Sequence, residues 1–128
     1  MLFNMAEKKK VLIAEDEKPM ARALEIKIGS DPELEARAVF NGAEALKILE
    51  AEKYDLVLTD LMMPDVDGFT LLKELKAKNI KVPVIISSNL SQEEDIKLTK
   101  SLGAIDYFVK SDTPISEVVK KIKKALGI

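Results

Sequence analysis

Acidic side chains that follow short apolar runs are the residues of this sequence whose types could do chemistry. Glu15 and Asp16 come directly after the run VLIA, and Asp60 comes directly after the run LVLT. Ser88 ends a third apolar run, and Lys110 follows a fourth. A carboxylate oxygen can attack phosphorus, while an amine and a hydroxyl can contact the phosphoryl oxygens. If these side chains converge, they predict phosphoryl transfer onto Asp60.

Three carboxylates in one place also indicate a cation. Two like unit charges about 4 Å apart repel by roughly 4 kcal/mol at an effective dielectric constant of about 20. A bound divalent ion removes that repulsion. The sequence contains no histidine and no cysteine, so oxygen atoms are the ligands on offer, and they favour Mg²⁺ or Mn²⁺. The same composition excludes disulfides, zinc fingers, Ser-His-Asp triads and cysteine nucleophiles.

Length and charge limit the domain count and the kinds of partner. The 128 residues are typical of one domain, and their net charge of −2 gives no bulk attraction to nucleic acid or membranes. No apolar run approaches the ~18 residues of a membrane span, and the N-terminus lacks the pattern of a secretory signal. We therefore expect a cytoplasmic protein with no direct contact to nucleic acid or membrane.

The elements that must position the acids are short apolar strands. Residues 11–14, 56–59, 84–87 and 107–109 are apolar without polar alternation, as in strands buried on both faces of a parallel sheet. Residues 35–40 are half polar and indicate an edge strand. Helical patterns separate these runs, which predicts an α/β fold, a doubly wound (βα)₅ sheet of five parallel strands. The carboxyl ends of its strands share one rim, where sites form.

Helix starts are predicted at three places by capping residues. They are Asn41 with Glu44, Ser91 with Glu94, and Thr113 before Pro114.

Asp65 and Asp67 are expected to have structural roles. Pro64 and Gly68 mark a loop, and Asp67 stands where the N-cap of a helix over residues 69–78 belongs. An alternative stays open, because DVDG is similar to the DxDG motif of haloacid-dehalogenase-type phosphatases, with Asp65 as nucleophile and Asp67 as acid. In that family the motif follows a strand directly, whereas a loop precedes it here.

Four segments, in order and at matching spacing, resemble the receiver domain of two-component response regulators. They are AED at 14–16, DLMMPDVDG at 60–68, SSN at 87–89 and YFVK at 107–110. The resemblance covers residues 9–128 and leaves residues 1–8 as a disordered N-terminal extension. It implies a flavodoxin-like fold with strand order 2-1-3-4-5.

The resemblance assigns an acceptor and a metal site. Asp60 would take the phosphoryl group from a histidine kinase or a phosphotransfer protein. Asp16, Asp60 and the backbone carbonyl of Met62 would bind Mg²⁺ directly, with Glu15 acting mainly through water.

The resemblance also implies a switch. Lys110 would contact a phosphoryl oxygen, Ser88 would move toward the phosphoryl group, and Tyr107 would turn inward into the space that Ser88 leaves. The face formed by the fourth helix, fifth strand and fifth helix would then change its preference for partners. The partners implied are a downstream protein or an attached output domain, with a second copy of the chain after phosphorylation as a further candidate. We expect a signalling switch and not an enzyme acting on other molecules.

The sequence departs from the family pattern beside the predicted site. Ser111 stands where a proline usually follows the lysine, so a cis peptide bond is not expected there. Asn89 stands where a small residue usually follows the hydroxyl. Met62 and Leu90 occupy the positions that influence hydrolysis in the family, two residues after the acceptor and two after the hydroxyl. Both are apolar and cannot orient an attacking water, so we expect a long-lived phosphoryl group.

A degenerate receiver that serves only as an interaction module is the remaining alternative. Such receivers usually lack one of the acids or the lysine, and none of these is missing here. The chain ends at Ile128, just past the last predicted helix, so we expect either a stand-alone receiver or the N-terminal part of a longer regulator.

Overall fold

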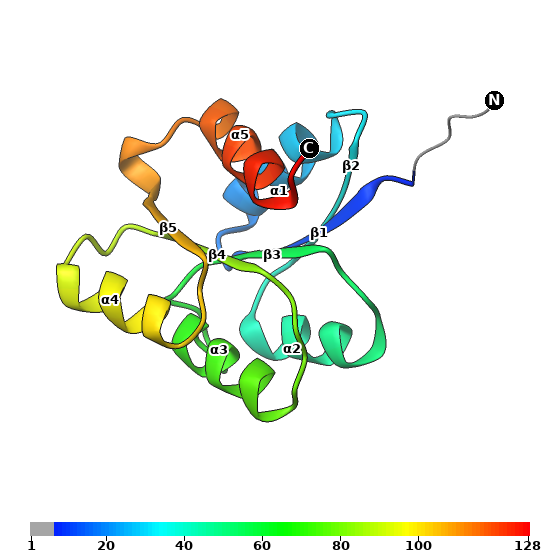
Figure 1. Ribbon diagram of the computed structural model, residues 1–128. Coiled ribbons are helices and arrows are strands. Elements are labelled where there is room, and N and C mark those ends of the chain that lie inside the picture. The colour runs from blue at the N-terminus through cyan, green and yellow to red at the C-terminus, as the bar shows by residue number, and fades with distance from the viewer. Residues whose placement is uncertain (1–6) are drawn as a thin grey trace.

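The fold is an α/β sandwich around one parallel sheet (Figure 1). The computed structural model describes residues 7–128, so most of the extension expected at residues 1–8 lies outside the described residues. The described chain forms five parallel strands in the order β2-β1-β3-β4-β5, which confirms the predicted fold class and strand order. The strands are β1 (Lys9–Ala14), β2 (Leu34–Val39), β3 (Leu56–Thr59), β4 (Val84–Ser88) and β5 (Asp106–Val109).

The inner strands are mostly apolar because both of their faces are buried. In β1, Val11 and Ile13 join the core on one side of the sheet, and Leu12 and Ala14 join the core on the other side. This follows from the two-residue period of a strand. The edge strand β2 differs, since Glu35 within it is exposed.

Helices cover both faces of the sheet. In Figure 1, α1 (Lys18–Gly29) and α5 (Ile115–Leu126) lie above the sheet, and three helices lie below it. Those three are α2 (Gly42–Ala51), α3 (Gly68–Ala77) and α4 (Glu93–Ser101). A single 3₁₀ turn, η1 (Lys110–Asp112), connects β5 to α5. Because all five strands are parallel, their carboxyl ends lie along the same rim of the sheet.

Two of the four predicted helix caps are present, and two are wrong. The Asn41 side chain accepts the backbone N–H of Glu44 at 2.7 Å, and the Asp67 side chain accepts that of Thr70 at 2.8 Å. The cap predicted at Ser91 is wrong, because α4 begins one residue later than that cap requires, after Gln92, with no side-chain cap.

The start predicted for the last helix is displaced by one residue. Pro114 itself occupies the cap position of α5, and the helix begins at Ile115. The hydroxyl of Thr113 donates to the carbonyl of Val109 at 2.9 Å and does not cap the helix.

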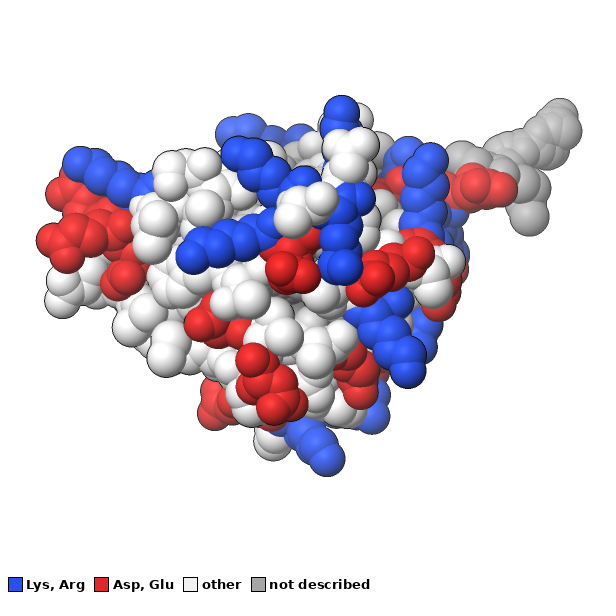
Figure 2. All heavy atoms as spheres, turned by 90° about the horizontal axis from the view of Figure 1, so that it is seen from below, with Lys and Arg blue, Asp and Glu red and all other residues white. Residues whose placement is uncertain are grey.

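The surface carries mixed charge. Figure 2 shows acidic and basic side chains interspersed on the side where α2 and α3 lie. No helix formed by residues 7–128 combines the length and apolar character that a bilayer crossing needs.

Candidate functional site

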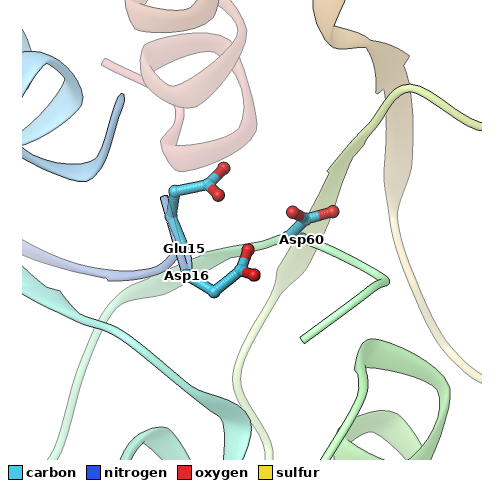
Figure 3. Close-up of side chains that lie close together, drawn as sticks. All are labelled: Glu15, Asp16 and Asp60. Atoms are coloured by element: carbon cyan, nitrogen blue, oxygen red, sulfur yellow. The ribbon is translucent and has the colours of Figure 1, made fainter. Parts of the chain in front are cut away.

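Three carboxylates meet at the rim where the strands end. Glu15 and Asp16 follow β1, and Asp60 follows β3, its neighbour in the sheet. Each offers an oxygen, and these oxygens lie within 4.8 Å of one another (Figure 3). Glu15 and Asp60 are buried, whereas Asp16 is exposed. The structure therefore brings together the three acids that the sequence singled out.

Lys110 lies between two of these acids. Its Nζ is 2.8 Å from Asp60 Oδ2 and 2.5 Å from Glu15 Oε1. The lysine side chain is only 10% exposed. It reaches the acids from the end of β5, two strands away from β3, which only the sheet order makes possible.

Burial perturbs the charges of this group. Burial raises the pKa of Glu15 above its usual value, although hydrogen bonds from Lys110 and the Glu17 N–H act in the opposite direction. Burial alone lowers the pKa of Lys110, but its hydrogen bonds to Asp60 and Glu15 outweigh this effect and raise it. Lys110 therefore stays charged, while three acids face one cation.

Backbone groups fix the orientation of the Asp60 carboxylate. Its Oδ1 accepts the N–H of Leu61 at 2.7 Å and that of Met62 at 3.4 Å. Gly68, at the start of α3, packs so closely that an added Cβ would lie 2.6 Å from the Asp60 carbonyl oxygen. The sequence analysis used Gly68 only as a loop marker and missed that it makes room for the acceptor segment.

A small pocket of about 240 Å³ opens beside these residues. It is lined by Asp16, Glu17, Asp60, Met62, Ser88, Asn89, Leu90 and Lys110. Glu17 was not predicted as a site residue, although its place directly after the paired acids was a usable signal. The Met62 side chain is 60% exposed at this pocket, so an apolar group borders the acceptor.

Ser88 and Tyr107 both contact the backbone of Leu90. The buried Ser88 hydroxyl accepts the Leu90 N–H at 3.1 Å, and the Tyr107 hydroxyl donates to the Leu90 carbonyl at 2.6 Å. Burial raises the pKa of the Tyr107 phenol. Tyr107 thus already points inward, whereas the resemblance implied an inward turn after Ser88 moves.

The two departures beside Ser88 and Lys110 meet in one contact. The Oδ1 of Asn89 accepts the backbone N–H of Ser111 at 3.2 Å. As expected for a bond to serine, the peptide bond between Lys110 and Ser111 is trans.

Asp65 and Asp67 lie outside the pocket lining. Asp65 is exposed and has a φ of 68°, and Asp67 uses its side chain to cap α3. Their positions disfavour the phosphatase alternative, in which Asp65 is the nucleophile.

The donor set fits a hard divalent cation. All three clustered side chains supply carboxylate oxygens, which Mg²⁺ and Mn²⁺ prefer. Lys110 contacts both Glu15 and Asp60, whereas Asp16 is the exposed acid of the three.

Comparisons with known proteins identify the same kind of module. A family model described as "Response regulator receiver domain" matches residues 11–123. The "Probable transcriptional regulator ycf27" of Porphyridium aerugineum is 37% identical over 93% of this chain, which spans 51% of that protein. This chain therefore spans about half the length of that relative.

Two solved structures are similar in both fold and sequence. The receiver domain of Francisella response regulator 1452 is 33% identical, with a TM-score of 0.88 over 94% of this chain and 98% of that one. The phosphorylated cyanobacterial phytochrome response regulator RcpA is 30% identical, with a TM-score of 0.79 over 91% of this chain and 92% of that one.

Proposed function

This chain belongs to the response regulator receiver domains, and we propose that it accepts a phosphoryl group on Asp60 and acts as a signalling switch. One observation carries the proposal. The Asp60 carboxylate is oriented by two backbone N–H groups, lies 2.8 Å from the Lys110 amine and opens onto the rim pocket. That RcpA is described in its phosphorylated form supports the same chemistry. The receiver domain assigned to residues 9–128 is part of this proposal.

The donor is a phosphohistidine of a kinase or of a phosphotransfer protein. A carboxylate oxygen of Asp60 attacks the phosphorus, and the bond from phosphorus to the histidine nitrogen breaks with its electron pair on that nitrogen. The product is an acyl phosphate on Asp60. Lys110 neutralises charge on a phosphoryl oxygen, and the Ser88 hydroxyl donates a hydrogen bond to another phosphoryl oxygen. Because such donors are made with ATP, the proposal includes a cytoplasmic location.

Asp16 and Asp60 would hold Mg²⁺ together with the carbonyl of Met62, and Glu15 would act through water. When bound, the ion supplies positive charge that screens the acids from an incoming phosphoryl group. Glu15 has a second task, since its contact with Lys110 holds that amine at Asp60.

The signal would pass through the Ser88 and Tyr107 pair to the face formed by α4, β5 and α5. Rearrangement of the Leu90 backbone, which both side chains contact, would alter that face. Its partner is a downstream protein, an output domain or a second copy of the chain.

Intact-mass measurement after incubation with phosphoramidate and Mg²⁺ tests the acceptor. We expect one phosphoryl group on the wild-type chain and on Asp65→Asn, and none on Asp60→Asn. An unmodified wild type would support the interaction module, and loss of the adduct in Asp65→Asn alone would support the phosphatase alternative.

The same adduct, followed after removal of the donor, tests the predicted long lifetime. Met62 and Leu90 line the pocket and cannot orient water, so decay should be slow. Met62→Asn introduces a polar side chain at the same place and should shorten the lifetime. A wild-type adduct that decays within seconds, or a variant that decays no faster, would contradict this part.

A further inference from the structure

The segment after β4 is tied to the segment after β5 by the Asn89 side chain. Its Oδ1 accepts the Ser111 N–H at 3.2 Å, which joins residues 22 positions apart. One residue further on, the Leu90 carbonyl accepts the Tyr107 hydroxyl at 2.6 Å. Asn89 and Leu90 are neighbours in the loop after β4. Asn89 is therefore tied to Ser111 in η1, and Leu90 to Tyr107 in β5.

The Ser111 N–H belongs to the first turn of η1, where backbone donors lack partners within the helix. Val109 occupies the cap position of this turn and makes no side-chain cap hydrogen bond. The Asn89 side chain therefore accepts a backbone N–H from the first turn of η1, as an N-cap side chain would, although it belongs to the loop after β4. The turn that makes this contact begins with Lys110.

Each end of this hydrogen bond is next to a residue of the pocket. Asn89 follows Ser88 and itself lines the pocket, and Ser111 follows Lys110. We propose that the contact between Asn89 and Ser111 is a positioning clasp, which holds the Ser88 hydroxyl and the Lys110 amine in register around Asp60. The inference rests on the proposed function, because register matters only if these groups contact a phosphoryl group together.

The expected effect of the clasp is modest. Asn89 and Ser111 are exposed, so water competes for both groups. Loss of the clasp should slow phosphoryl uptake from phosphoramidate by about 2- to 5-fold, as expected for one exposed hydrogen bond. It should not abolish uptake, as Asp60→Asn does.

Variants at both ends test the clasp. Asn89→Leu removes the acceptor at similar size, and Ser111→Pro removes the donor but also restricts the backbone of Lys110. Ser111→Ala keeps the N–H and should react as the wild type does. If the Asn89 side chain acts through the Ser111 N–H, Asn89→Leu should slow uptake in the wild type but cause no further slowing in the Ser111→Pro background.

Amide hydrogen exchange of Ser111 separates positioning from a general structural effect. Exchange should become faster in Asn89→Leu and stay slow in Asn89→Asp, which keeps an acceptor oxygen. The clasp is refuted if the double variant slows uptake by the product of the two single-variant factors, or if Ser111 exchange is unchanged in Asn89→Leu. Either result leaves the proposed function intact. A wild type that takes up no phosphoryl group would refute the proposed function and, with it, the catalytic role of the clasp.

Discussion

A lysine bridges two carboxylates at each end of the sheet, and the two clusters differ in burial. We call them the rim cluster (Glu15, Asp16, Asp60 and Lys110) and the distal cluster (Asp31, Glu33 and Lys123). In the distal cluster the lysine Nζ lies 3.0 Å from Asp31 and 2.9 Å from Glu33, close to the distances at the rim. The Lys123 side chain is 26% exposed and that of Lys110 is 10% exposed.

Similar ion pairs are accompanied by opposite shifts in the pKa of the acids. A backbone hydrogen bond from Glu33 and the Lys123 amine lower the pKa of Asp31, as is usual for a paired surface acid. Burial raises the pKa of Glu15 in spite of its lysine. The rim cluster also has a third acid, so three acids share one lysine there, whereas two acids share one lysine in the distal cluster. Burial and one extra acid, not the ion pairs themselves, therefore distinguish the rim cluster from the distal cluster.

Removal of each lysine should produce the largest difference between the clusters. Lys110→Met leaves two buried carboxylates without a cation and should lower the free energy of unfolding by about 3 kcal/mol. Lys123→Met breaks partly exposed pairs and should lower the free energy of unfolding much less. Urea denaturation at pH 7 in the presence of EDTA measures both. Equal losses would show that burial does not distinguish the clusters.

Mg²⁺ should stabilise the protein through the rim cluster alone. At a concentration ten times the Kd, a bound ion adds about 1.4 kcal/mol to the free energy of unfolding. Thermal denaturation should show a higher Tm for the wild type in Mg²⁺ and a smaller increase for Asp16→Asn. Asp31→Asn is the matched control and should respond as the wild type does. An increase that survives in Asp16→Asn would remove that residue from the proposed ligands.

The smallest expected effect is a difference in pH dependence without metal. The pKa of Glu15 is raised from its usual 4.5, so its contribution to stability is complete below that pH and falls as the pH rises through the folded-state pKa. The pKa of Asp31 is lowered from 3.8, so its contribution is present above that pH and is lost as the pH falls.

Glu15→Gln should therefore become more stable relative to the wild type as the pH rises, and Asp31→Asn as the pH falls. Unfolding free energies measured across the acidic range compare the two variants. The same slope in both would contradict the opposite pKa shifts.

Much of the fold was predictable because strands buried on both faces must be apolar throughout. The runs before Glu15 and Asp60 are of this kind, and both were found as strands. The cap at Ser91 was wrong, because α4 buries only Thr99 and the position of its start depends on tertiary contacts more than on local sequence.

The candidate site was predictable as a set of residues but not as a set of contacts. The acids were found because each follows an apolar run, and Lys110 because it follows another. The double contact of Lys110 with Asp60 and Glu15, and the contact of Asn89 with Ser111, were not foreseen. These partners come from different strands, so no local pattern encodes their distance.

The sequence by itself determined the alternation of strands and helices and which carboxylates stand at strand ends, because both follow from local apolar patterns. Only the tertiary structure decided which carboxylates each lysine contacts, Asp60 and Glu15 for Lys110 and Asp31 and Glu33 for Lys123. Lys110 meets Asp60 across 50 residues and Lys123 meets Asp31 across 92. The physical reason is that strand order selects the partner of each lysine, and burial then sets how strongly their charges interact.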